Sequence, residues 1–295
     1  MSNRHFRPWL FILPGIIMGF IVLAIPVAQA LRNSLFRIRL YRLDQQVFVN
    51  WENYQRLWGD PIFLMSVRTT VLFTVGCTLL SVLLGLAIAG VLATSGIRGT
   101  VGARLLIAFY LVPFVTTPVV VGMLGRLFMW EPEYGLVNFL LSGIGIDGAN
   151  WLIDRNTALL AAVITNAWRL TPLALLIFYA ALATIPDAYI ESARVDGASG
   201  LTILTRIKIP LIRFHISFVG LVMLTSAFRE FDVIYSLTGG GPGRATEVLS
   251  MLVYNRGVVN SNLGVASAVS FSMFVVVAIV ALIYIAVARL GNLGR

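Results

Sequence analysis

The stretch ESARVDGASGLTILTRIKIP, residues 191–210, decides how this chain is organised. It carries charged, small and glycine residues, yet it lies between two strongly apolar runs, 157–183 and 214–237. A run of roughly 20 apolar residues is long enough to cross a bilayer as a helix, whereas a charged and bent segment needs water or a protein partner. The stretch therefore predicts a surface segment between two membrane helices.

The composition of the whole chain also indicates a membrane protein. Of its 295 residues, 58% are hydrophobic and 12% are charged, and the mean hydropathy is +0.88. A soluble domain carries about 25% charged residues. The net charge of +9 comes from basic residues scattered between apolar runs, which indicates membrane-flanking charges and no nucleic-acid surface. Cys77 is a single cysteine, and His5 and His215 are far apart, so neither a disulfide framework nor a metal site is expected.

Six apolar runs predict six transmembrane helices in one all-α integral membrane domain that covers residues 1–295. The runs are too long and continuous for the strands of a barrel. Six spans place both termini on the same side of the membrane. The basic residues divide almost evenly between the two sides, so the positive-inside rule does not choose the orientation. The predicted spans are approximately 9–31, 69–97, 105–129, 157–183, 214–237 and 263–288.

The first run has a second interpretation. Arg4 and Arg7, an apolar stretch and then Ala28-Gln29-Ala30 imitate a cleavable signal peptide, but the apolar part is longer than the usual 7–15 residues. A retained helix is the favoured reading. Small residues support helix packing, with Gly15 and Gly19 on the first run and Ser81, Gly85 and Ala89 on one face of the second, although glycine is common in membrane helices anyway.

Residues 184–210 predict two short helices joined at a bend. Thr184 with Asp187 resembles a capping box, and Asp196-Gly197 would end the first helix because glycine adopts the required backbone angles. Ser199 is placed to cap a second helix, which Pro210 ends or bends before the next span. On spacing alone, an ordinary amphipathic connector at the membrane surface explains the segment equally well.

The same residues resemble a known motif. Glu191-Ser192-Ala193, Gly197 six residues after the glutamate, and Ile207-Lys208-Ile209-Pro210 are similar to the EAA loop of ABC-importer permeases. That pattern reads Glu-Ala-Ala, then glycine, then nine residues and Ile-x-Leu-Pro. Every spacing fits, and the departures at Ser192 and Ile209 keep the side chains similar in size.

Two further motifs extend the resemblance to maltose-type importers for carbohydrates. Phe48 to Tyr54 with Asp60-Pro61 resembles the segment before the second span of sugar-importer permeases, and Phe231 to Tyr235 with Thr238-Gly239-Gly240-Gly241-Pro242 resembles the end of their fifth span. The last motif is typical of one of two paired permeases. The resemblance implies a type I importer fold, a second related permease, an ATP-binding cassette dimer, an extracytoplasmic solute-binding protein and a place in the bacterial inner membrane among lipid.

The resemblance also assigns residues 184–213 to a cytoplasmic coupling loop, so that both termini are cytoplasmic. In the family a short helix of this loop docks in a cleft of the ATPase subunit. The residues that this resemblance implies for ATPase coupling are Glu191, Ser192, Ala193, Asp196, Gly197, Ala198, Ile207 and Pro210.

The chain contains no recognisable machinery for bond chemistry. A phosphate-binding loop needs a lysine followed by serine or threonine, and the only lysine, Lys208, precedes isoleucine. Gly143-Ile-Gly145-Ile-Asp-Gly148 spells GxGxxG but lacks the strand that gives that motif its meaning. We therefore expect no catalytic residue, metal or cofactor in this chain, and ATP and magnesium bound by partner subunits.

Several charged residues fall inside predicted spans. Arg169 lies near the middle of the fourth, where a charge costs about 2.5–3.5 kcal/mol on insertion scales. Such a group either faces a polar solute path, which would suit an anionic sugar derivative, or pairs internally with a carboxylate such as Glu230 or Asp232; for Asp232 a structural role is favoured. Aromatic residues near these spans are suited to stacking on sugar rings, namely Trp168, Tyr179, Phe228 and Tyr235. For Trp130 and Tyr235 an interfacial aromatic belt is the favoured interpretation. The candidates for the solute path are Arg169, Trp168, Arg126, Arg229, Glu230 and Phe228.

The sequence thus predicts a permease subunit of an ATP-driven importer for a carbohydrate or related small solute. An ion-coupled secondary transporter is the alternative, and it would need acidic residues deep in the spans, where only Glu230 and Asp232 come close. A membrane-embedded enzyme would need clustered polar catalytic groups at one depth, and the spans supply no clear set.

Overall fold

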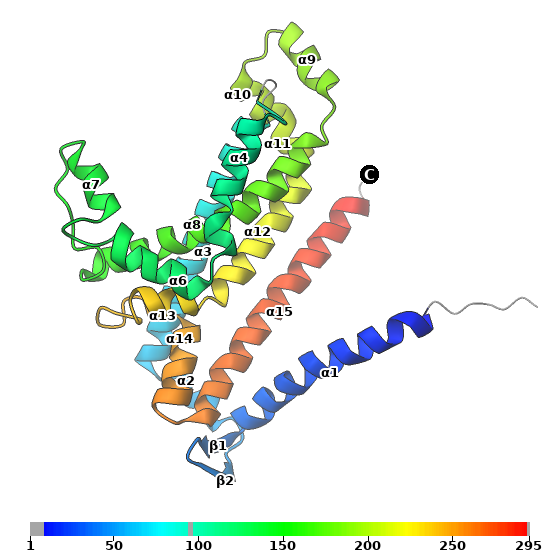
Figure 1. Ribbon diagram of the computed structural model, residues 1–295. Coiled ribbons are helices and arrows are strands. Elements are labelled where there is room, and N and C mark those ends of the chain that lie inside the picture. The colour runs from blue at the N-terminus through cyan, green and yellow to red at the C-terminus, as the bar shows by residue number, and fades with distance from the viewer. Residues whose placement is uncertain (1–8, 94–96, 294–295) are drawn as a thin grey trace, which may run out of the picture. The chain divides into compact units, whose positions relative to one another are not determined.

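The computed structural model describes residues 9–93 and 97–293, and this part of the chain is mostly helical (Figure 1). It forms two compact units. The first contains residues up to Leu64 together with Leu252–Ala278, and the second contains Met65–Met251 together with the residues from Ile279 onward. The loop 184–213 and the charged residues of the fourth and fifth runs all belong to the second unit.

The elements follow one another in the order of the predicted runs. Two strands form an antiparallel hairpin, β1 (Phe36–Arg39) and β2 (Arg42–Phe48). Three π-helical turns interrupt the helices, η1 (Gly125–Met129), η2 (Leu204–Lys208) and η3 (Asn255–Val259). The helices are α1 (Trp9–Ser34), α2 (Glu52–Trp58), α3 (Pro61–Leu92), α4 (Val101–Tyr110), α5 (Val112–Val115), α6 (Pro118–Leu124), α7 (Leu136–Ser142), α8 (Arg155–Ala183), α9 (Asp187–Val195), α10 (Gly200–Ile203), α11 (Ile209–Leu211), α12 (Arg213–Phe228), α13 (Asp232–Leu237), α14 (Leu249–Tyr254) and α15 (Leu263–Leu293).

Among the described residues, four helices are long and apolar enough to cross a membrane. They are Phe11–Ser34, Pro61–Leu92, Arg155–Ala183 and Leu263–Val287, and they match the first, second, fourth and sixth predicted runs. The number in the described residues rises to six if each of two bent helix pairs counts as one span. The first helix continues without a break through Ala28-Gln29-Ala30.

The third run is a broken helix, so the expectation of one continuous helix over 105–129 is wrong. Val101–Val115 and Pro118–Met129 are bent by 101° at Thr116 and Thr117, which both have extended backbones with ψ of 143° and 141°. Proline disfavours the helical conformation of the residue before it, and Pro118 follows Thr117 directly. The proline therefore ends one helical segment and begins the next.

The fifth run is broken as well. The helix α12 ends at Phe228 and α13 begins at Asp232, with Phe231 outside helical geometry at φ −128° and ψ −50°. A single helix over 214–237 is therefore not formed. At its other end, α12 is bent by 75° from the segment Gly200–Leu211.

The first unit contains a β-hairpin that the sequence did not predict. The hairpin β1–β2 pairs Phe36 with Phe48 and Arg39 with Arg42. Buried Asn53 of α2 holds the hairpin to α1, because its Nδ2 donates to the carbonyl oxygens of Ser34 (2.7 Å) and Phe36 (3.0 Å). The segment that resembles sugar-importer permeases, Phe48 to Tyr54, thus joins the hairpin to α2.

The core of the second unit is built around α8. Its buried Phe178 and Leu175 belong to one hydrophobic cluster with Phe73 of α3 and Trp130, which follows η1. The side chain of Trp130 is 1% exposed, and its Nε1 donates to Thr165 Oγ1 at 2.7 Å. The expected role of Trp130 in an aromatic belt is therefore wrong, because the side chain is enclosed by protein.

Small residues let α3 and α8 approach closely. A Cβ added at Gly85 would lie 2.7 Å from Ala174 Cβ and 3.0 Å from the Leu175 nitrogen, and Ser81 donates to the carbonyl oxygen of Ala167 at 3.4 Å. The predicted packing face of Ser81 and Gly85 is thus confirmed. Gly15 and Gly19 of α1 have nothing within 4 Å of an added Cβ.

We expect Gly85→Val to lower the free energy of unfolding by about 1–3 kcal/mol, because the added methyl groups overpack the contact with α8. The matched control is Gly220→Val in α12, where an added Cβ would meet nothing within 4 Å. Thermal unfolding of the detergent-solubilised protein would measure both. Equal midpoints for the two variants would contradict the close packing of α3 on α8.

Candidate functional site

The loop 184–213 forms the predicted pair of short helices. The first helix, α9, ends at Val195, and Gly197 has φ of +78°, which glycine adopts without the penalty that other residues suffer. The second, α10, is capped by Ser199, whose Oγ accepts a hydrogen bond from the Thr202 amide at 3.2 Å. The bend at 196–197 and the cap at Ser199 are therefore confirmed.

The start of the loop differs from expectation. Thr184 belongs to the end of α8, and its hydroxyl donates to the carbonyl oxygen of Ala181 at 2.7 Å. Pro186 occupies the N-cap position of α9 without a side-chain cap. The capping box of Thr184 and Asp187 is thus wrong, because α9 begins at Asp187 and Pro186 occupies its N-cap position in place of Thr184.

The end of the loop passes through a π-helical turn into the next membrane helix. The turn η2 leads directly into α11, which contains Pro210 in its first turn. The chain then bends by 75° into α12. Pro210 therefore marks the bend before this helix, as predicted.

Arg98, which lies outside the loop 184–213, contacts residues at the start of the loop. Arg98 Nη2 donates to the carbonyl oxygen of Ala183 at 2.7 Å, and its Nη1 lies 3.5 Å from Asp187 Oδ1. The hydrogen bond satisfies a carbonyl at the C-terminus of α8, and the charge suits that end of a helix. Both ion-pair partners are well exposed, so the pair itself adds little stability.

The residues predicted for ATPase coupling divide into a less exposed and an exposed set. Ala193 is buried, and Ala198 and Ile207 are half-buried, so these three support the loop. Three large apolar side chains of the same loop also face solvent: Tyr189 (59% exposed), Val195 (88%) and Leu201 (70%). The exposed residues of the predicted coupling set are Glu191, Ser192, Asp196, Gly197 and Pro210.

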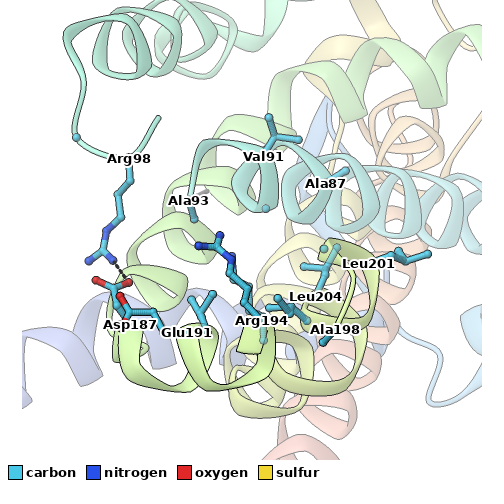
Figure 2. A pocket seen from close by; sticks show the side chains of 16 residues that line it. Ala87, Val91, Ala93, Arg98, Asp187, Glu191, Arg194, Ala198, Leu201 and Leu204 are labelled. Carbon is cyan, nitrogen blue, oxygen red and sulfur yellow. Dashed lines mark ion pairs between the residues drawn. The ribbon is translucent and has the colours of Figure 1, made fainter. Parts of the chain in front are cut away.

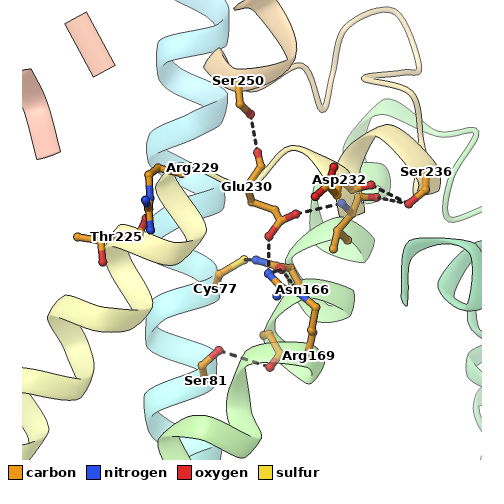
Figure 3. Close-up of polar contacts among 12 residues, drawn as sticks. Cys77, Ser81, Asn166, Arg169, Thr225, Arg229, Glu230, Asp232, Ser236 and Ser250 are labelled. Carbon is orange, nitrogen blue, oxygen red and sulfur yellow. Dashed lines mark hydrogen bonds and ion pairs between the residues drawn. The ribbon is translucent and has the colours of Figure 1, made fainter. Parts of the chain in front are cut away.

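Arg169 pairs with Glu230 inside the second unit (Figure 3). The side chains are only 12% and 6% exposed. Arg169 also donates from Nη2 to Asn166 Oδ1 at 2.9 Å, and Glu230 Oε1 accepts from the Val233 amide at 3.0 Å. Glu230 therefore pairs with Arg169 through Oε2 and caps the start of α13 through Oε1. Of the two readings for Arg169, internal pairing is the arrangement that the structure shows.

The remaining candidates for the solute path differ in their exposure. Arg126 is exposed on η1, and Arg229 is exposed with its Nε donating to the carbonyl oxygen of Thr225 at 3.2 Å. Trp168 is half-buried and Phe228 is 8% exposed. Asp232 is exposed at the start of α13, and the ion pairs of the described residues do not include it.

Two polar residues of this network were not singled out from the sequence. Asn166 holds Arg169, and its Nδ2 lies 3.5 Å from the sulfur of buried Cys77. The spacing of three residues between Asn166 and Arg169 places them on one helix face, which is a signal that could have found the asparagine. Cys77 had no such signal, because it sits on a different helix. The GxGxxG residues 143–148 follow α7, so no strand precedes them.

Comparison with known proteins identifies relatives in both sequence and fold. The chain is 36% identical over 273 residues to the sn-glycerol-3-phosphate transport system permease protein UgpA of Agrobacterium fabrum, covering 92% of this chain and 90% of the relative. It is 33% identical to the trehalose/maltose transport system permease protein MalF of Thermococcus litoralis, covering 95% and 93%. A bacterial ABC transporter that imports the acidic polysaccharide alginate has the same fold, with a TM-score of 0.75, 22% identity, and coverage of 95% and 94%.

The predicted type I permease fold and the resemblance to ABC-importer permeases are therefore confirmed. The model of one family, described as the inner membrane component of binding-protein-dependent transport systems, matches residues 62–292. This match contains the loop 184–213, the pair Arg169–Glu230 and both broken helices. The chain belongs to the family of inner-membrane components of binding-protein-dependent transport systems.

Proposed function

We propose that this chain is one of two related permease subunits of an ABC importer that carries a carbohydrate or a related small polar solute. An extracytoplasmic binding protein delivers the solute, and a dimer of separate ATPase subunits binds ATP and magnesium. The loop 184–213 and both termini face the cytoplasm. The chain itself makes or breaks no bond.

The observation that carries this proposal is the geometry of the loop 184–213. Its first helix, α9, presents Val195 and Tyr189 to solvent beside the charged groups of Glu191 and Asp196. Exposed apolar side chains with a polar rim are typical of an interaction surface. A surface of this kind between two apolar helices supports docking of a cytoplasmic subunit.

The same loop has the connections needed to transmit a movement. It is continuous with α8 at one end and, through η2 and α11, with α12 at the other. Both helices contribute to the core, with α8 residues such as Phe178 and α12 residues such as Met223 fully buried. A push on α9 would therefore reach two helices that line the same packed interior. Rocking of such helices would give the alternating access that transporters use.

The solute class rests on the relatives and on the exposed charges. The names of the relatives specify sn-glycerol-3-phosphate and trehalose or maltose. Arg126 and Arg229 are exposed in the second unit, on η1 and at the end of α12. These arginines favour a hydroxylated solute that carries a negative charge.

A co-purification followed by a transport assay tests the proposal. The tagged chain, expressed with the products of its neighbouring genes, should retain an ATPase subunit and a second permease. In proteoliposomes, uptake should require ATP on the side of the membrane that the loop 184–213 faces. It should not respond to a proton or sodium gradient. Uptake driven by an ion gradient without ATP would instead establish the secondary transporter.

A further inference from the structure

The loop 184–213 encloses a cavity of about 960 Å³ on its inner side (Figure 2). The wall opposite the loop comes from the end of α3 and from the turn at Arg98 and Gly99. All lining residues belong to the second unit. The cavity shares Glu191 and Ala198 with the residues that we assign to ATPase coupling. Its basic members Arg98, Arg194 and Lys208 are not among those residues.

Basic side chains line the cavity. Arg98, Arg194 and Lys208 contribute three positive charges, against two negative charges from Asp187 and Glu191. The carboxylates lie outward, since the side chain of Asp187 is 70% exposed and already pairs with Arg98, and Glu191 is exposed. The inner part of the cavity is therefore positive.

Lys208 is the unusual member of this set. It is the only lysine of the chain and is 9% exposed, yet its ammonium group has no hydrogen bond or ion pair among the described residues. Burial lowers the pKa of Lys208, the charges of Arg194 and Arg98 lower it further, and Asp187 opposes the shift. Lys208 lies at the wall of the cavity, where a negative group would be a favourable partner for its ammonium group.

The cavity also has an apolar edge. Val91 at the end of α3 is 61% exposed and Leu201 of α10 is 70% exposed, and Ala87 and Leu204 lie beside them. An inorganic anion would make no use of this edge. A molecule with a phosphate group and hydrocarbon chains would use both the basic interior and the edge.

From these observations we propose that this cavity binds the phosphate group of an anionic phospholipid, with Lys208 as the principal contact and the acyl chains on Val91 and Leu201. Basic pockets between membrane helices on the cytoplasmic side bind anionic headgroups in this way. A lipid bound here would join α3 to the inner side of the loop. The inference rests on the proposed cytoplasmic position of the loop but not on ATPase binding.

The test is lipid retention measured by native mass spectrometry. The full chain, with the subunits that co-purify, is released from nanodiscs that contain phosphatidylglycerol and phosphatidylcholine with identical acyl chains. Wild type should retain phosphatidylglycerol in preference to phosphatidylcholine. Lys208→Met should retain about tenfold less, because a charge-assisted hydrogen bond is lost. Arg206→Met removes the same charge from an exposed position on η2 and should leave retention unchanged, as should the conservative change Lys208→Arg.

Three outcomes would overturn the proposal. Equal retention of the two lipids by wild type would show that the cavity does not select an anionic headgroup, and this result depends on no variant. Wild-type retention by Lys208→Met, with its fold verified by an unchanged midpoint of thermal unfolding, would show that Lys208 is not the contact. Stabilisation of the delipidated protein by inorganic phosphate alone, without retention of phosphatidylglycerol, would show that the source is free phosphate. Loss of the ATPase subunit with lipid binding intact would contradict the proposed function and leave this site in place.

Discussion

Replacement of Gly197 by valine is expected to reduce solute-stimulated ATP hydrolysis of the assembled importer about tenfold, with an unchanged amount of the chain in the membrane. Gly197 has φ of +78°, and an L-residue in this region costs about 1–2 kcal/mol, which corresponds to a factor of about ten in the population of the loop conformation. A Cβ at this position would meet nothing within 4 Å, so the effect isolates the backbone.

Gly200→Val provides the matched control for this experiment. Gly200 begins α10 three residues later, has an ordinary φ, and also has nothing within 4 Å of an added Cβ. ATP hydrolysis is measured in proteoliposomes with the binding protein and solute present. If Gly197→Val retains the stimulation seen for Gly200→Val, the bend between α9 and α10 does not carry the coupling.

Arg169→Met is expected to lower the free energy of unfolding by about 3–5 kcal/mol, because it leaves the carboxylate of Glu230 buried without its partner. Glu230 is 6% exposed and keeps only the Val233 amide as a hydrogen-bond donor to its side chain among the described residues. Denaturation in mixed micelles, followed by the tryptophan signal, measures the loss. The second change Glu230→Gln in the same chain should recover part of it, since the neutral amide removes the buried charge.

A neighbouring arginine separates the loss of the pair from the loss of a charge. Arg229→Met removes an exposed guanidinium whose Nε donates to the carbonyl oxygen of Thr225, and it should change the stability by less than about 0.5 kcal/mol. If Arg169→Met keeps wild-type stability but abolishes uptake, the arginine contacts the solute and the ion pair is not its main role. Reduced stability of Arg169→Met, with partial recovery in the double variant, would establish that the pair stabilises the fold.

The pair also explains why the fifth run is not one helix. Glu230 lies in the break between α12 and α13, where it accepts from the Val233 amide and binds Arg169 of α8. A glutamate inside a continuous helix would direct its carboxylate away from its own backbone amides. The break thus satisfies a charge that would otherwise be costly inside the membrane.

Local features of the loop could be predicted because short-range chemistry decides them. Gly197 allows the turn, Ser199 caps a helix, and Pro210 cannot continue one without disturbance. The capping box at Thr184 did not form, because α9 begins at Asp187 and Pro186 occupies its N-cap position. Thr184 instead ends α8, where its hydroxyl donates to the carbonyl oxygen of Ala181, and spacing alone does not show at which residue a helix begins.

The lengths and charges of the apolar runs were enough to predict a helical membrane protein with a charged loop between its fourth and fifth runs, because the bilayer makes run length and charge decisive. The long-range partners of the charged residues became visible only in the folded chain. Arg169 pairs with Glu230 and not with Asp232, and Lys208 lines a cavity. Trp130 donates to Thr165 inside the protein and does not lie at the membrane surface. The physical reason is that these contacts join residues far apart in the chain, and their energies depend on burial that no local pattern records.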